Sequence, residues 1–241
     1  MPHIPPAKRH PYDQWSPDAR ALDLVGDKWT LLIIRDLISG PRRFVELQRV
    51  LPGISTEQLR SRLNRMVADG MLTRKRYREV PPRVDYELTE RAIALAPVIG
   101  ELARWGYDWT WGTPRPLEAI DVGAIFRLLP GLLPSGAKTT GRIDFTVIDG
   151  RDGDETTVYS IVIEDGGLHL TEHGPDQELP AGSPDAAARG SATAWVRALG
   201  PDPDLSGLEF SGPRELSSLV LETLSPDEPH AEATVAESAV S

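Results

Sequence analysis

The chain has no cysteine, and this absence excludes several kinds of chemistry. None of its 241 residues can form a disulfide, hold a metal as a thiolate, attack a substrate as a thiol or sense oxidants through a thiol. The sequence also lacks the apolar run of about 18 residues that a membrane-spanning helix needs. Its first residues, MPHIPP, contain no apolar core of the kind found in signal peptides. We therefore expect a cytoplasmic protein.

Basic residues are the minority, because 26 Lys and Arg stand against 36 Asp and Glu, but their distribution is uneven. Residues 1–112 carry 18 basic and 14 acidic residues, a net charge of +4, and the remaining residues carry 8 and 22, a net charge of −14. Residues 42–83 alone have a net charge of +7. This split predicts two domains with different partners.

Composition and periodicity together divide the chain into four predicted segments. Residues 1–15 are expected to form a flexible arm, and residues 226–241, which have almost no core-forming side chains, a disordered tail. Between them, residues 16–112 and 113–225 are each long enough to bury a core of their own. We therefore expect an α+β protein of two folded domains.

The first of these domains begins with three predicted helices. A serine cap followed by proline, Ser16-Pro17, starts the first helix. The second helix covers residues 29–39, is apolar on most sides, and ends at Gly40-Pro41. Apolar residues spaced three and four apart predict a short third helix over residues 44–51.

A turn then leads into a fourth helix, which presents a polar surface to solvent. Ser55 and Gln58 form a capping-box pattern, and the helix continues to about Asp69. Leu59 and Leu63 lie on its apolar stripe, so the polar and basic side chains between them face outward.

The period then changes from 3.6 residues to two. Residues 71–78 form a strongly basic strand, and residues 84–88 alternate as its return strand. Thr89 starts a long helix that reaches about Trp111, which Pro97 must kink or split.

Three helices, a turn, a helix, a basic hairpin and a final helix make up the order of a winged helix-turn-helix. In this architecture the capped helix enters the major groove and the hairpin contacts the DNA backbone or the minor groove. The predicted DNA-contacting residues are Arg42, Arg43, Ser55, Thr56, Gln58, Arg60, Ser61, Asn64, Arg65, Arg74, Arg76, Arg78 and Arg83.

Four blocks in this region resemble one family of DNA-binding proteins. The blocks are ALDLVGDKWTLLIIRDL at 21–37, GPRRFVEL at 40–47, LPGIS at 51–55 and EVPPRVDYELT at 79–89. Residues 16–111 resemble HxlR-type domains, a branch of the MarR-like winged-helix regulators. The resemblance implies a homodimer, joined through the first and last helices of the domain and bound to an inverted-repeat operator in double-stranded DNA.

One position departs from that family. Its members often carry a cysteine just before the first helix and use it to sense oxidants or electrophiles, whereas Ser16-Pro17 stands there in this chain. Thiol sensing is therefore chemically absent, and any input to this regulator must be of another kind.

The second predicted domain mixes strands and helices. Helical stretches are expected at residues 117–129 and 191–199, and a last helix opens at residues 212–215. Strands are expected at residues 141–149, 156–164, 167–171 and 205–210, and residues 186–189 are expected to form an edge strand.

Neither metal ligands nor catalytic groups emerge from this half. His169 and His173 are four residues apart, but the glycines around them exclude the helix that would make them a zinc pair. The acidic turn after Asp149 lacks the glycine and glutamate of an EF-hand at the required positions. No nucleophile elbow, phosphate-binding loop or dinucleotide fingerprint is present. We expect no cofactor and no enzymatic activity.

Residues 113–225 resemble the SCP2-like, or sterol-carrier, fold. The resemblance lies in GSATAWVRALG at 190–200, the strand after it, and FSGPREL at 210–216 leading into the last helix. It implies an apolar ligand site or a domain that supports the dimer. The candidate pocket residues are Phe126, Leu129, Phe145, Trp195 and Phe210, although a lone tryptophan is more often a core anchor than a ligand contact.

The sequence leaves three functions in competition. The leading hypothesis is a transcriptional regulator, with activator or repressor undecided, whose DNA affinity an apolar molecule in the second domain modulates. A constitutive regulator with a purely structural second domain is the next. The third is a carrier of lipids or other apolar ligands whose winged helix docks to proteins, which the charge of +7 over residues 42–83 disfavours.

Overall fold

The computed structural model describes residues 11–78, 83–133, 139–149 and 155–225. The expectations for most of the N-terminal arm, the hairpin tip, the acidic turn after Asp149 and the C-terminal tail lie outside these residues. No helix among the described residues is long and apolar enough to cross a membrane.

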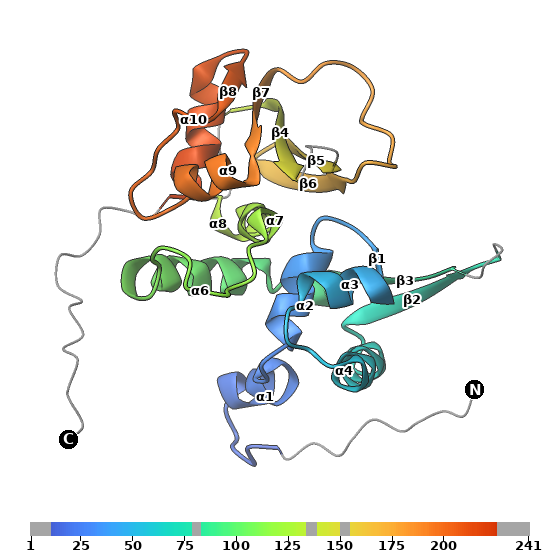
Figure 1. Cartoon of the computed structure of the whole chain (residues 1–241). Coiled ribbons are helices and arrows are strands. Elements are labelled where there is room, and N and C mark those ends of the chain that lie inside the picture. The colour runs from blue at the N-terminus through green and yellow to red at the C-terminus, as the bar shows by residue number, and fades with distance from the viewer. Residues whose placement is uncertain (1–10, 79–82, 134–138, 150–154, 226–241) are drawn as a thin grey trace.

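The N-terminal domain has the predicted order of helices and hairpin, and in addition a short strand, β1, which was not predicted (Figure 1). Its elements are α1 (Pro17–Val25), α2 (Thr30–Leu37), β1 (Arg42–Arg43), α3 (Phe44–Val50), α4 (Thr56–Ala68), β2 (Leu72–Tyr77), β3 (Arg83–Leu88), α5 (Glu90–Ile93) and α6 (Ala96–Trp109). The three strands form an antiparallel sheet in the order β1-β3-β2, which extends away from the helices as the wing.

The long helix expected from Thr89 is split in two. The first piece, α5, ends at Ile93, and α6 begins at Ala96 with Pro97 in its first turn. Proline has no amide hydrogen to donate and fits the start of a helix, so the break falls just before it.

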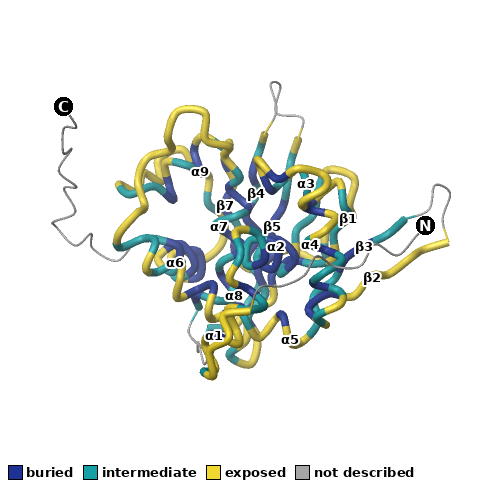
Figure 2. Tube along the Cα trace, turned by 90° about the horizontal axis from the view of Figure 1, so that it is seen from below, coloured by how far each residue is buried: buried dark blue, intermediate teal, exposed yellow. Residues whose placement is uncertain are grey.

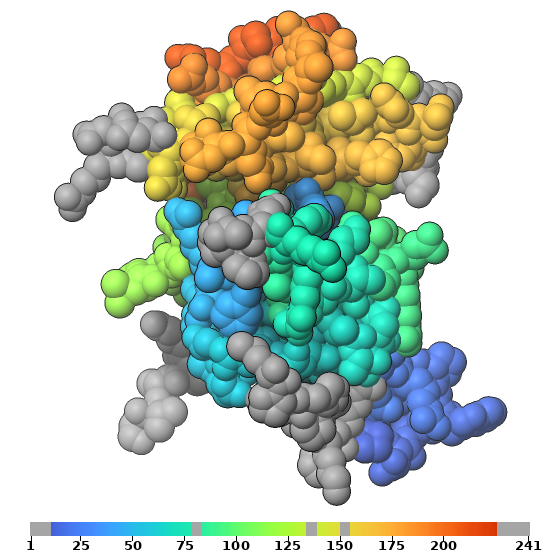
Figure 3. Space-filling model, turned by 90° about the vertical axis from the view of Figure 1, so that its right-hand side faces the viewer, coloured from blue at the N-terminus to red at the C-terminus, as the bar shows by residue number. Residues whose placement is uncertain are grey.

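The second half is an α+β unit around a five-stranded sheet. Its elements are α7 (Val122–Phe126), α8 (Leu129–Leu132), β4 (Gly141–Asp149), β5 (Glu155–Glu164), β6 (Gly167–His173), β7 (Ala186–Ser191), α9 (Ala192–Ala198), β8 (Glu209–Ser211) and α10 (Arg214–Thr223). The strand order is β6-β5-β4-β7-β8, antiparallel except for the parallel pair β4 and β7. In Figure 3 this half lies directly on the N-terminal domain.

Three predictions for this half were wrong. The last strand, expected over residues 205–210, is the shorter β8 (Glu209–Ser211). The helical stretch expected over residues 117–129 is reduced to α7 and the start of α8, because Leu117 has a positive φ of 66° and Pro130 opens a new helix. The strand β7 is not an edge strand, since it lies between β4 and β8. Its small residues serve close packing: a Cβ at Gly190 would lie 2.5 Å from the side chain of Leu208.

Each half has its own hydrophobic core, and α6 contributes to both. Figure 2 shows buried segments towards the middle of the molecule, whereas most of β2 in the wing is exposed. Ile99 packs in the N-terminal core, whereas Ala103 and Tyr107, one and two turns later, pack against the core of the second half. The helix crosses α8 at very short range, because a Cβ at Gly100 would lie 2.1 Å from the carbonyl oxygen of Gly131. The two halves are therefore packed together through α6.

Candidate nucleic-acid interface

The helix α4 presents a polar face that its own cap holds in place. Ser55 Oγ accepts a hydrogen bond from the amide of Gln58 at 3.1 Å, and Gln58 Oε1 accepts one from the amide of Ser55 at 3.1 Å. Leu59 and Leu63 are buried on the opposite face. The exposed side chains of α4 and its cap are Ser55, Thr56, Glu57, Gln58, Arg60 and Ser61, and Asn64 and Arg65 are half-buried beside them.

Several of these side chains already have partners within the domain. Gln48 Nε2 donates to Thr56 Oγ1 at 2.8 Å, and Arg60 lies 2.9 Å from the carboxylate of Glu57. Both contacts are on the surface, where such pairs exchange readily with other partners and contribute little stability. The face remains available to a nucleic acid.

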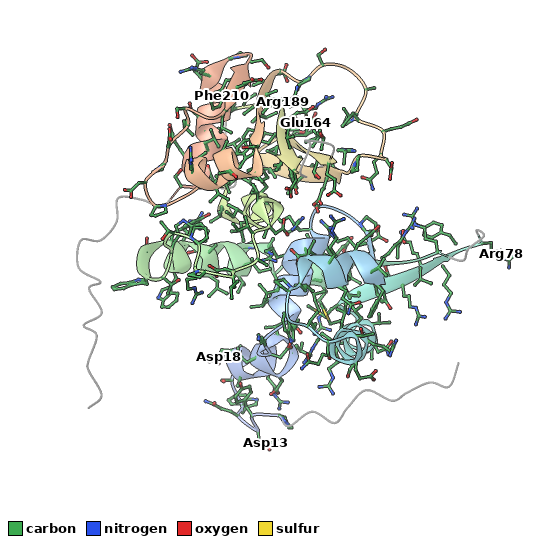
Figure 4. The ribbon with its side chains drawn as sticks, viewed as in Figure 1. Asp13, Asp18, Arg78, Glu164, Arg189 and Phe210 are labelled. Carbon is green, nitrogen blue, oxygen red and sulfur yellow. The ribbon has the colours of Figure 1, made fainter. Side chains whose placement is uncertain are left out.

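The wing divides its basic residues between two faces. Residues opposite one another in an antiparallel pair share a face, and the register pairs Arg74 with Tyr86 and Arg76 with Val84. Arg78 lies at the far end of the wing (Figure 4). Arg74, Arg76 and Arg78 are exposed, and none has an ion-pair partner within the described part of the chain.

The other face of the wing is neutralised internally. Lys75 forms an ion pair with Glu87, and the guanidinium of Arg83 lies 2.6 Å from the buried carboxylate of Asp85. Arg83 also lies over the ring of Tyr77, with its Cζ 5.2 Å from the ring centroid. Of the predicted wing contacts, Arg83 is therefore tied into the sheet, whereas Arg74, Arg76 and Arg78 are available.

The predicted pair at the start of α3 is also divided. Arg43 is exposed and caps α3, with its amide donating to Glu46 at 2.6 Å. The side chain of Arg42 is only 13% exposed and lies 2.5 Å from Glu172 in the second half. The register pairs Arg42 with Tyr86, on the same face of the sheet as Arg74 and Arg76, so its contact with Glu172 and not strand alternation withholds it from DNA. Arg42 is therefore not available for the predicted DNA contact.

Comparison with known proteins covers this same region. The HxlR-like helix-turn-helix family matches residues 24–113. An uncharacterised HTH-type transcriptional regulator of Bacillus subtilis, YvaP, is 36% identical over 90 residues, which is 37% of this chain and 83% of YvaP. Another, from Halalkalibacterium halodurans, is 43% identical over 94 residues, which is 39% of this chain and 83% of that protein.

This chain belongs to the HxlR-like helix-turn-helix family. Among solved structures, the redox regulator HypR in its reduced form is 37% identical. The match covers 38% of this chain and 90% of the HypR chain, with a TM-score of 0.37. These matches cover the HxlR-like domain, and the SCP2-like resemblance of residues 113–225 stays a prediction.

The predicted ligand residues lie mostly in the solid core of the second half. Phe126, Leu129, Phe145 and Trp195 are fully buried. The ring of Trp195 lies 5.0 Å from those of both Phe126 and Phe145, and its Nε1 donates to the carbonyl of Thr146 at 2.9 Å. Four of the five predicted pocket residues are therefore packed in the core of the second half.

Two cavities lie elsewhere in the described residues. A pocket of about 380 Å³ is lined by Leu205, Ser206, Leu208, Phe210, Arg214, Ser218 and Leu221, so Phe210 is the one predicted residue that borders it. A cleft of about 600 Å³ lies between the HxlR-like domain and the second half, and its wall includes Arg42, Arg127 and Glu172. His169 and His173 lie on β6, and the described residues hold no cluster of three possible metal ligands.

The charged residues between the two halves were not predicted. Asp36 and Arg127 are both fully buried and form an ion pair at 3.2 Å. Each is a charged residue within an apolar helical stretch, LLIIRDLI and AIFRLL, and that pattern is the signal that could have found them.

Proposed function

We propose that the protein is a transcriptional regulator that binds an inverted-repeat operator as a homodimer. The observation that carries this proposal is the exposed basic face of the wing beside the polar face of α4. Three wing arginines, which have no acidic partner among the described residues, supply phosphate contacts, and α4 supplies groups that can read base edges. The proposal rests also on the family, whose named relatives are transcriptional regulators.

The experiment is selection of DNA from a random-sequence library by the full-length protein. We expect the bound duplexes to converge on two similar half-sites in inverted orientation, because a two-fold dimer presents two copies of α4 to the DNA. A bound pool without any enriched sequence would contradict an operator-specific regulator.

An exposed apolar surface supports the homodimer. Val98, Leu102, Trp105 and Trp109 recur along one face of α6, and all four are exposed. Leu22 on α1 is exposed as well. Apolar patches of this kind mark interfaces, and α6 extends away from the wing, so a dimer formed there leaves the DNA face free (Figure 1).

We also propose that an apolar small molecule modulates DNA binding through the second half. The pocket beside Phe210 supports this: Leu205, Leu208 and Leu221 supply apolar lining, and Arg214 lies at its wall, with Cζ 5.7 Å from the Phe210 ring centroid. This pocket, and not the buried core residues, is the proposed ligand site. Because the chain has no cysteine, treatment with diamide is expected to leave DNA binding unchanged.

The test is titration of anilinonaphthalene sulfonate with and without the selected duplex. Coupling is reciprocal, so DNA must change the affinity for the apolar probe by the factor by which the probe changes the affinity for DNA. Phe210→Ala should weaken probe binding, whereas Leu179→Ala, which changes an exposed leucine outside the pocket, should not. Equal probe affinities with and without DNA would leave the second half a structural support.

A further inference from the structure

The side chain of Arg127 joins the two halves at the centre of their interface. It is 1% exposed and lies 3.2 Å from Asp36, 2.7 Å from Asp121 and 2.9 Å from Glu172. A buried charge of this kind is tolerated only where opposite charges and hydrogen bonds compensate its lost hydration. Burial acts to lower the pKa of Arg127, but Glu172 and Asp121 raise it overall, so the guanidinium stays charged.

Glu172 carries this contact onward to the DNA-binding domain. Its carboxylate, at the end of β6, accepts from Arg127 Nε at 3.0 Å and from Arg42 Nη2 at 2.5 Å, and Ser39 Oγ lies 3.4 Å away. Arg42 also donates from Nε to the carbonyl oxygen of Asp36 at 2.6 Å. Together with Asp121, three residues from the HxlR-like domain and three from the second half thus share one polar cluster.

Arg42 lies where α3 and the base of the wing meet. Its backbone pairs with Tyr86 in the wing strand β3, and the next residue, Arg43, caps α3. The first helix of the helix-turn-helix, α3, therefore begins two residues after the side chain that contacts Glu172.

We propose that Glu172 is a positioning residue for DNA binding, which acts through Arg42 to fix the start of α3 and the base of the wing against the second half. The inference rests on the proposed function. Its consequence is that residues far from the DNA face set the relative orientation of α4 and the wing. The second half then contributes to operator recognition without touching DNA.

An exposed ion pair between the halves provides a comparison. Arg49 and Glu155 lie 3.2 Å apart across the same interface, but their side chains are 78% and 59% exposed. A solvated pair of flexible side chains holds no fixed geometry. Glu155→Gln and Glu172→Gln remove the same charge from the same sheet, so they differ in positioning rather than in net charge.

The experiment compares full-length variants on a duplex that the wild type has selected from a random library and on a scrambled duplex of equal composition. We expect Glu172→Gln to weaken the selected duplex about tenfold, or about 1.4 kcal/mol, and Glu155→Gln to leave it unchanged. Binding to the scrambled duplex should not weaken in either variant, because it depends on charge rather than on the placement of α4. Circular dichroism melting confirms that each variant is folded.

Arg42→Lys tests whether Glu172 acts through Arg42. Lysine keeps the charge but cannot hold the Asp36 carbonyl and Glu172 together. It should reproduce the loss of Glu172→Gln, and the double variant should lose no more than either single one. If Glu172→Gln does not fold, Arg42→Lys decides the question alone. Wild-type affinity of Arg42→Lys for the selected duplex would overturn the proposal.

Three results would count against positioning. The proposal is overturned if Glu172→Gln binds the selected duplex as tightly as Glu155→Gln does. It is overturned as well if the losses of affinity add in the double variant, or if the selected and scrambled duplexes lose affinity equally. If the wild type selects no duplex, the proposed function itself fails, and this proposal falls with it before any variant is compared.

Discussion

Arg42 and Arg43 are neighbours that the sequence does not distinguish, yet they have different roles. Arg43 is exposed at the cap of α3, whereas Arg42 is turned to Glu172. A similar division separates Arg83, paired with Asp85, from the exposed Arg76. Residue type and local charge predict a basic surface, but which arginines are paired depends on strand register and on carboxylates distant in sequence.

Gln58 has two roles that a suitable substitution can separate. Its Oε1 completes the cap of α4, so Gln58→Ala should cost roughly 0.5–2 kcal/mol of folding stability. Gln58→Glu keeps an acceptor for the cap but loses the amide donors that could read a base. We expect its preference for the selected duplex over one with a single substituted base to fall by about 1–3 kcal/mol at that base, with little change in melting.

Fluorescence anisotropy on the two duplexes measures this preference. The added charge of Gln58→Glu repels both duplexes alike and cancels in the ratio of affinities. An unchanged ratio at every base would show that Gln58 caps the helix and reads nothing.

Tyr107 carries a buried hydroxyl without a hydrogen-bond partner among the described residues. Burial raises the pKa of Tyr107 to about 12. Between about pH 10 and pH 12 the folded chain keeps a proton that the unfolded chain has released, so the free energy of unfolding falls as pH rises. Below pH 10 the hydroxyl still costs the hydration that it lost on folding.

Tyr107→Phe should therefore raise the free energy of unfolding by about 1 kcal/mol near neutral pH and reduce the alkaline loss. Urea unfolding of both proteins at pH 7 and pH 11 checks this. A variant less stable than the wild type at both values would show that the hydroxyl has a partner.

At the scale of elements, local signals succeeded where they were strong. The cap at Ser55, the alternation of residues 84–88 and the proline at 97 predicted α4, β3 and the break before α6. The strand β7 was misplaced because strand order depends on pairing between distant segments, and its alanines and glycine gave no strong strand signal. The contact of Gly100 with Gly131 has no local signal at all.

That glycine contact predicts opposite outcomes for two substitutions on α6. A Cβ at Gly100 would overlap the backbone of Gly131, so Gly100→Ala should destabilise the protein by about 1–3 kcal/mol. A Cβ at Gly106 meets only Thr110 Oγ1 at 3.8 Å, and Gly106→Ala should add about 0.5–1 kcal/mol through helix propensity. Denaturant unfolding distinguishes them, and equal effects would contradict the close crossing of α6 and α8.

The apolar face of α6 predicts the assembly. Leu102→Arg places a charge in the proposed dimer interface and should give particles of one chain, 26.4 kDa, in light scattering. Leu179→Arg, a matched change at an exposed leucine of the second half, should leave the mass of two chains. A Leu102→Arg protein that remains a dimer would move the interface elsewhere.

The whole molecule combines a basic reading surface with a strongly acidic second half. The charge pattern predicted this division, and the family match covers the half that carries the basic surface. The sequence did not predict that the halves share α6 and a buried cluster around Arg127, since the cluster's contacts between the halves join residues 91 to 133 positions apart. Three of the predicted ligand residues, Phe126, Phe145 and Trp195, pack against one another in the core.

The most direct test of DNA binding is its salt dependence, measured by anisotropy with the selected duplex. A dimer that neutralises about 6–10 phosphates should give a slope of log affinity against log salt near −5 to −9, and Arg76→Ala, which removes one arginine from each wing, should reduce its magnitude by about 2. A slope near zero, or one that Arg76→Ala leaves unchanged, would contradict a DNA interface formed by α4 and the wing.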